Sequence, residues 1–311
     1  MEVPVITLQN TKAEIFAAYQ GKLQYIDDCL KENQWLQDQL KECKSQLEAP
    51  ANQPLAELIS KPEHVTVCIP YVRSLAQGNE LQLAIRGWAE NFKQGMNIVV
   101  IGDREDWMND LVHVIECERI SNNPPLDVVH KMMLAIESDQ VTDKFIWAND
   151  DQYLISPCML ADFETLKCTG KLGDKNMGST LYQQNKKRTF DFLVKHGAPT
   201  WDFSTHTPFV FEKDLLEDMI KSFELTKEAH LVATLYFNWY FPYFIPYECE
   251  GPIALENDNL KVGVYRQNAD LDRLKKLMPR KKILSNSESG WSPALSEILN
   301  KQFASKCRFE N

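Results

Sequence analysis

The sequence predicts an α/β protein in which helices flank a mostly parallel β-sheet. Short apolar runs rich in β-branched residues alternate with amphipathic helical segments, and polar residues follow the ends of the apolar runs. In a doubly wound, Rossmann-like sheet of this kind, the ligand crevice lies beyond the carboxyl ends of the strands. The 311 residues, 44% of them hydrophobic, are enough for one or two domains with an ample core.

Residues 1–54 are predicted to form an N-terminal coiled-coil helix and a linker, separate from the main domain at 55–311. Between residues 11 and 48 there is no proline, and seven of ten positions at heptad spacing are apolar. This narrow seam favours a coiled coil whose buried Asn33 sets the register, and hence a homo-oligomer. The alternative is a single amphipathic helix lying across the main domain. Pro50 and Pro54 then mark the linker.

Hydrophobic periodicity places the elements of the main domain. We expect strands over 65–71, 97–101, 111–117 and 145–147, and helices over 80–92 and 126–137. Further on, we expect helices over 180–196, 213–223 and 293–303, a largely apolar segment over 229–239, and a strand entering a sharp turn over 201–211. The carboxyl ends of parallel strands meet at one edge of a sheet. Tyr71, Arg73 and Asp103 should therefore lie beside the residues that follow 145–147.

The strongest functional signal is the end of the strand at 145–147, where the apolar run stops at Asn149, Asp150 and Asp151. Adjacent carboxylates at the end of a core strand raise each other's pKa and are costly to bury unless a cation neutralises them. Mg²⁺ and Mn²⁺ prefer oxygen ligands and can take up charge on a leaving phosphate. The pattern predicts a divalent-metal and nucleotide-sugar site; the alternative is an acidic turn in which Asp150 caps the next segment.

Three stretches of the chain occur in the order found in a known family. They are Val67-Cys68-Ile69-Pro70-Tyr71 with the downstream Ala84-Ile85-Arg86, then Ile146-Trp147-Ala148-Asn149-Asp150-Asp151-Gln152-Tyr153, then Thr205-His206-Thr207-Pro208-Phe209. Over about residues 65 to 250 the chain resembles the Stealth family of capsular polysaccharide sugar-phosphate transferases and small glycosyltransferase-like proteins of GT-A type. The resemblance implies a GT-A-like enzyme that binds Mn²⁺ or Mg²⁺ through Asp150 and Asp151, with Asn149 as a second oxygen ligand or orienting group.

Several other residues are candidates for the same site. His206, which precedes Thr207-Pro208, is a candidate metal ligand or acid–base group, and Asp202 a candidate to orient it or to act as the base. Arg73 and Arg86 are candidates for contacting phosphate, with surface ion pairs as the alternative. Asp103 is a candidate for binding the nucleoside, with a plain turn residue as the alternative. Lys131 could reach a phosphate, but a solvated helix face is the favoured alternative.

These observations predict a metal-dependent glycosyltransferase that moves a sugar from a nucleotide-sugar donor, a UDP-sugar, to an acceptor hydroxyl. The first Stealth block carries an Asp where this chain has Tyr71-Val72-Arg73-Ser74, so glycosyl transfer ranks before Stealth-like sugar-1-phosphate transfer. The alternative from another class is a non-catalytic scaffold or binding protein with a degenerate transferase domain. Because the net charge is −10, general electrostatic binding of nucleic acid is disfavoured.

Composition also predicts the cellular location of the protein. The first residues lack a basic flank, and no apolar run approaches the roughly 18 residues needed to span a bilayer. The eight cysteines show no CxxC pair and no dense spacing, which is typical of reduced thiols rather than a disulfide framework. We therefore expect a cytoplasmic protein without a membrane span.

Overall fold

The structure is a computed structural model that describes residues 64–173, 177–248, 260–266 and 270–311. These residues all belong to one compact unit, Lys61–Asn311. The coiled coil and linker predicted for residues 1–54 lie outside the described residues and stay predictions.

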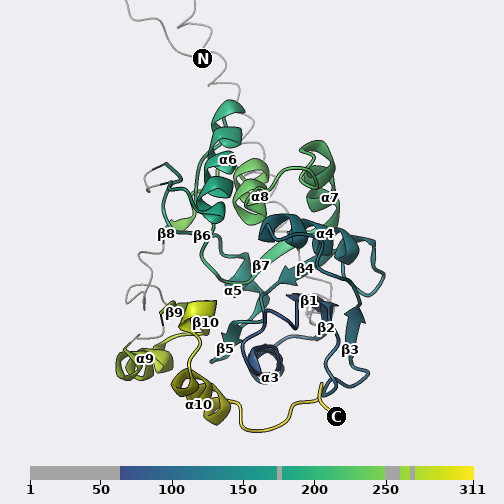
Figure 1. Ribbon diagram of the computed structural model, residues 1–311, viewed down its shortest axis with the longest axis vertical. Coiled ribbons are helices and arrows are strands. Elements are labelled where there is room, and N and C mark those ends of the chain that lie inside the picture. Colours follow the sequence, from purple (N-terminus) through teal and green to yellow (C-terminus); the bar gives the residue numbers. More distant parts are fainter. Residues whose placement is uncertain (1–63, 174–176, 249–259, 267–269) are drawn as a thin grey trace, which may run out of the picture. The chain divides into compact units, whose positions relative to one another are not determined.

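A five-stranded sheet forms the centre of the described unit, in the order β3-β2-β1-β4-β7 (Figure 1). Its strands are β1 (Val65–Tyr71), β2 (Met96–Gly102), β3 (Val112–Ile115), β4 (Lys144–Trp147) and β7 (Phe209–Glu212). The first four are parallel and β7 is antiparallel to β4. The near-continuous apolar runs of β1, β2 and β4 are buried on both faces, as parallel strands covered by helices require. The predicted α/β class with a mostly parallel sheet is confirmed.

Alternate residues of the strands enter two different cores. On one face, Val67 and Ile69 pack with helix α3 (Glu80–Asn91). On the other face, Cys68 lies in the core that contains α4 (Pro124–Glu137), α7 (Lys213–Ser222) and α8 (Val232–Tyr240). The helix that follows β1 and the helix that precedes β4 thus cover opposite faces. The boundary between β1 and β4 is therefore the topological switch point, where open α/β sheets bind ligands.

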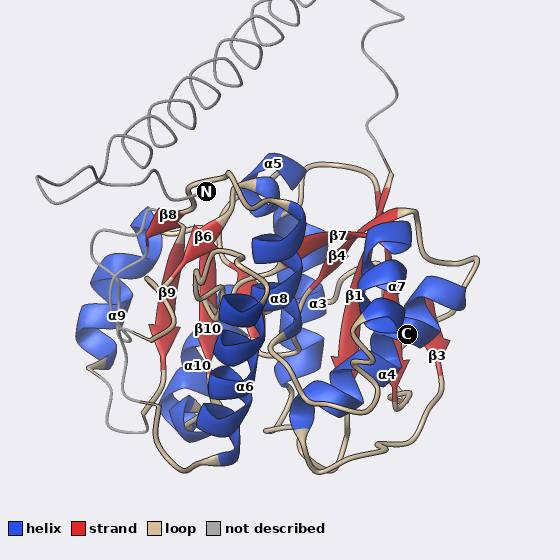
Figure 2. Cartoon of the chain, turned by 90° about the horizontal axis from the view of Figure 1, so that it is seen from above, coloured by secondary structure: helices blue, strands red, loops and turns tan. Residues whose placement is uncertain are grey.

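A second sheet packs against the other side of α3, with strands in the order β5-β10-β9. It consists of β5 (Gln152–Leu154), β10 (Ile283–Asn286) and β9 (Lys261–Val264), and its core includes α9 (Leu271–Leu277) and α10 (Pro293–Gln302). In Figure 2, β9 and β10 lie to the left of the central sheet. At Gly87 of α3, a Cβ atom would lie only 3.0 Å from the backbone nitrogen of Leu154. Glycine thus lets α3 approach β5 closely.

The remaining elements are short, apart from one helix. They are α5 (Leu160–Glu164), β6 (Lys167–Cys168), α6 (Leu181–Lys195), β8 (Tyr247–Glu248) and the 3₁₀ turns Met278–Arg280 and Glu288–Gly290. Strand β6 pairs in parallel with β8. None of the helices in the described part of the chain is long and apolar enough to cross a membrane.

The strand expected over 201–211 exists only at its end, as β7. Upstream, the backbone is held partly by side chains of α8 and partly by a single bridge to the segment after β6. Trp201 N donates to Asn238 Oδ1 (2.9 Å) and Phe203 N to Thr234 Oγ1 (3.1 Å), while Asp202 N donates to the carbonyl oxygen of Gly170 (2.8 Å). The loop before β7 is therefore held against α8, and it carries His206 to the switch point.

Candidate functional site

The predicted acidic pair lies at the switch point. Asp150 and Asp151 form the turn between β4 and β5, and both line a hollow of about 280 Å³. Pro70 and Val72, at the end of β1, form part of its wall, and so does Glu80 at the start of α3. The crevice expected from the sheet topology thus contains the two carboxylates that the sequence singled out.

Three carboxyl groups influence one another in this hollow. Burial, followed by the negative charges of Asp151 and Glu80, raises the pKa of Asp150 to about 7. Burial also raises the pKa of Glu80 to about 7, although hydrogen bonds from Asn286 Nδ2 (2.7 Å) and Gln77 N (2.9 Å) oppose this shift. Ionising several carboxyl groups close together costs free energy, and a bound cation lowers that cost.

Asp151 has one oxygen engaged and one without a partner. Its Oδ2 accepts a hydrogen bond from His206 Nε2 at 3.0 Å. Its Oδ1 is buried and has no hydrogen-bonding partner among the described residues. Burying an unpaired carboxylate oxygen costs free energy, and a divalent cation is a partner that fits such an atom beside a second carboxylate.

Protein groups alone do not complete a metal site here. The described residues contain no group of three or more His, Cys, Asp or Glu side chains that could hold a metal ion. Mg²⁺ is commonly held by one or two carboxylates, with waters and substrate phosphates as its other ligands. Asp150 and Asp151 fit that mode, in which the substrate supplies part of the coordination.

His206 has a strained backbone and a defined ring orientation. Its φ of 54° lies in the left-handed region, which non-glycine residues adopt mainly where function or packing enforces it. Nε2 lies 3.0 Å from Asp151 Oδ2 and 2.9 Å from the carbonyl oxygen of Asn286. Both neighbours are acceptors, so Nε2 carries the proton and Nδ1 is the basic nitrogen. A protonated Nε2 cannot ligate a metal, so Nδ1 is the ring nitrogen left to accept a proton or to bind a metal.

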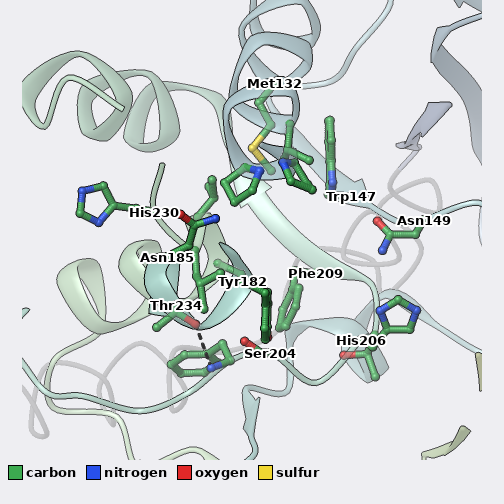
Figure 3. Close-up of a pocket in the computed structure, with 18 of the residues that line it drawn as sticks. Met132, Trp147, Asn149, Tyr182, Asn185, Ser204, His206, Phe209, His230 and Thr234 are labelled. Carbon is green, nitrogen blue, oxygen red and sulfur yellow. Dashed lines mark hydrogen bonds between the residues drawn. The ribbon is translucent and has the colours of Figure 1, made fainter. Parts of the chain in front are cut away.

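A larger, mostly apolar cavity of about 640 Å³ adjoins the acidic hollow (Figure 3). Pro124 and Val128 of α4 line both spaces. Figure 3 shows His206 and Asn149 at one end of the cavity. Asn149 lines this cavity and not the acidic hollow. The prediction that Asn149 is a second oxygen ligand or an orienting group stays a prediction.

Asp202 requires a correction. It is fully buried and accepts hydrogen bonds from Lys186 Nζ (2.5 Å) and Ser204 N (3.0 Å). Burial alone would raise its pKa, but these hydrogen bonds outweigh burial and the pKa is lowered. Asp202 is therefore a poor base, and the ring of His206 is oriented by Asp151 and Asn286. The expected role of Asp202 was wrong because the residues around it in the sequence give no sign that Lys186 pairs with it.

Arg86 also requires a correction. Its guanidinium donates two hydrogen bonds of 2.7 Å to Glu310 and one of 2.9 Å to the carbonyl oxygen of Phe303. This is the ion-pair alternative, not the phosphate contact, because α3 directs the side chain toward the C-terminal segment.

Tyr71, Arg73 and Asp103 form a network of their own at the ends of β1 and β2. The Tyr71 hydroxyl and Arg73 Nε both donate to Glu105 Oε1 at 2.8 Å, and Arg73 N donates to Asp103 Oδ2 at 2.7 Å. Tyr71 and Arg73 border a third hollow of about 320 Å³ rather than the acidic one. Asp103 thus acts as a turn residue here, and Glu105 already binds Arg73.

The cations that border the acidic hollow are Lys131 and Arg119. Lys131 is only 1% exposed, and its Nζ lies 3.2 Å from Asp127 Oδ2 and 3.3 Å from the carbonyl oxygen of Tyr71. The expectation of a solvated position for Lys131 was wrong, because α4 packs this face against β1. The i, i+4 spacing of Asp127 and Lys131, on the helix leading to the acidic strand end, is the sequence signal that was missed.

No family model matches the chain, and no curated protein matches it. The fold and the site therefore define an α/β protein with a Rossmann-like sheet and a carboxylate-rich crevice at its switch point.

Proposed function

We propose that this protein is a metal-dependent glycosyltransferase of GT-A-like type, which moves a sugar from a UDP-sugar to an acceptor hydroxyl. The observation that carries the proposal is the buried, unpaired Oδ1 of Asp151 beside Asp150, at the switch point of the sheet. That position is where α/β proteins bind nucleotides, and that atom lacks the partner that a cation would supply.

The acidic hollow is the donor side of the proposed site. Asp150 and Asp151 would hold Mn²⁺ or Mg²⁺, and an ion there would stabilise the negative charge of the departing diphosphate. Arg119 borders the same hollow and would add positive charge toward the phosphates, whereas Lys131 is already paired with Asp127.

His206 is the proposed base on the acceptor side. Asp151 Oδ2 and the carbonyl of Asn286 hold Nε2–H, which leaves the lone pair of Nδ1 for a proton from the acceptor hydroxyl. A base whose tautomer is fixed by a carboxylate keeps the correct nitrogen toward its substrate. Asp151 thus would serve both halves of the site, through a different oxygen for each.

Melting temperature tests the proposal. We expect UDP with Mn²⁺ to raise the melting temperature of the full chain, and either component alone to raise it less. A ligand at a hundred times its dissociation constant adds about 2.7 kcal/mol, which corresponds to several degrees. GDP and CMP are the controls for the choice of nucleotide. If no nucleotide raises the melting temperature in the presence of Mn²⁺, the proposal is refuted.

Mass spectrometry of the donor products separates the two kinds of transfer. When UDP-sugars are incubated with the protein and Mn²⁺, we expect slow release of UDP, because a glycosyltransferase leaks donor to water. Sugar-1-phosphate transfer would instead release UMP.

Binding of Mn²⁺ and UDP should strengthen as pH rises from 6 to 8. The pKa values of Asp150 and Glu80, raised to about 7 from 3.8 and 4.5, mean that protons compete with a cation below neutral pH. We expect roughly three- to thirtyfold tighter binding at pH 8, measured by calorimetry. Equal affinities at the two pH values would contradict this expectation.

The protein without ligand should respond in the opposite sense. A carboxyl group whose pKa is raised by folding binds its proton more tightly in the folded state, so stability falls as pH rises toward 7. The rise in melting temperature that Mn²⁺ and UDP cause should therefore be largest at pH 8.

A further inference from the structure

The 640 Å³ cavity beside the acidic hollow is apolar and aromatic over most of its wall. It is formed by the starts of α4, α6 and α8 together with β4 and β7. Its ring-bearing side chains include those of Trp147, Tyr182, Phe203, Phe209 and Phe211. A cavity of this size is suited to a small molecule, and aromatic walls favour flat rings, which stack against them.

Most polar side chains of the wall are already engaged within the protein. Asn185 exchanges hydrogen bonds with Asn123 (2.7 Å), and the hydroxyl of Thr234 accepts one from Phe203 N (3.1 Å). A saccharide placed here would bury several hydroxyl groups without partners, at a free-energy cost for each. The cavity is therefore unsuited to an oligosaccharide.

The polar end of the cavity contains the proposed base, His206. His206 and Asn149 lie together there (Figure 3), and Nδ1 of His206 makes no hydrogen bond to the described residues. Through its Nε2 the same ring contacts Asp151, which lines the acidic hollow. A hydroxyl at this end would lie between the base and the donor.

We propose that this cavity binds the acceptor, and that the acceptor is a small aromatic compound whose hydroxyl group lies against His206. This inference rests on the proposed glycosyl transfer. The acceptor oxygen forms a bond to the anomeric carbon, and the bond from that carbon to the diphosphate oxygen breaks. The hydroxyl proton passes to Nδ1 of His206, and the nucleoside diphosphate leaves with the bonding electron pair.

Umbelliferone, a fluorescent phenol, is a suitable probe because its binding can be measured without turnover. The variant Ala233→Trp places an indole in the cavity from the second residue of α8. Ala294→Trp is the matched control, because Ala294 is the second residue of α10, is exposed and lies outside the cavity. We expect the wild type and Ala294→Trp to bind umbelliferone equally, and Ala233→Trp to bind it roughly tenfold or more weakly.

Binding of UDP with Mn²⁺, measured on the same three proteins, distinguishes the two proposals. If umbelliferone binds the cavity but UDP with Mn²⁺ does not bind, the glycosyltransferase proposal fails, and the inferred acceptor role fails with it. If UDP with Mn²⁺ binds but umbelliferone does not, or binds Ala233→Trp as well as the wild type, only the acceptor inference is overturned. If maltose binds the wild type and not Ala233→Trp, the acceptor inference is overturned too.

If Ala233→Trp melts several degrees lower than the wild type, the variant Leu231→Trp replaces it, because Leu231 lies at the N-cap of α8 and lines the same cavity.

Discussion

Asp151→Asn is expected to abolish Mn²⁺-dependent binding of UDP and to lower donor turnover strongly, without unfolding the protein. The substitution keeps the shape of the side chain but removes the charge of the unpaired, buried oxygen. Losing the cation removes several kcal/mol of transition-state stabilisation, so turnover should fall on the order of 10²- to 10³-fold. Calorimetry with UDP and Mn²⁺ and mass spectrometry of the donor products measure the two effects.

Asp106→Asn is the matched control for this variant. Asp106 is exposed in the loop after β2 and lines none of the hollows described above, so the same change of charge should leave binding and turnover unaltered. Without ligand, Asp151→Asn should melt at the wild-type temperature or above it, because the substitution removes a buried carboxylate that repels Asp150. Wild-type affinity in Asp151→Asn would show that the carboxylate does not bind the cation.

Glu310→Gln is expected to lower the free energy of unfolding by about 3–5 kcal/mol, because it leaves a nearly buried guanidinium without its countercharge. The side chains of Arg86 and Glu310 are 12% and 1% exposed. Glu164→Gln is the control: Glu164 pairs with Lys144 at 2.9 Å, but the two side chains are 41% and 37% exposed, so the loss should stay within about 1 kcal/mol. Urea denaturation at pH 7 measures both variants, and equal losses would contradict the buried pair.

The same pair predicts a pH dependence in acid. Burial would raise the pKa of Glu310, but hydrogen bonds from Arg86, Cys307 N and Gln82 outweigh burial and lower it from 4.5 to about 2. A lowered carboxyl pKa contributes stability that is present above the unfolded value and is lost as pH falls toward 2. The difference in stability between wild type and Glu310→Gln should therefore shrink between pH 5 and pH 2.

Two aspects of the protein were determined by the sequence alone. The strands β1, β2 and β4 are nearly uninterrupted apolar runs rich in β-branched and aromatic residues, which suit only a sheet covered on both faces. Asp150 and Asp151 follow the end of β4 after only Ala148 and Asn149. Their position at the sheet edge followed from local pattern and from the parallel order of the strands.

Only the tertiary structure decided the partners of these residues, because burial and charge pairing join segments far apart in the chain. His206 is oriented by Asn286, Glu80 accepts a hydrogen bond from the same asparagine, and Arg86 pairs with Glu310. The residues around Glu80 and Arg86 in the sequence give no sign of Asn286 or Glu310. An arginine or lysine on a helix has the same local pattern whether it meets phosphate, a buried carboxylate or water. The packing of α3 and α4 determines which partner each of these side chains meets, because it sets how far the side chain is desolvated.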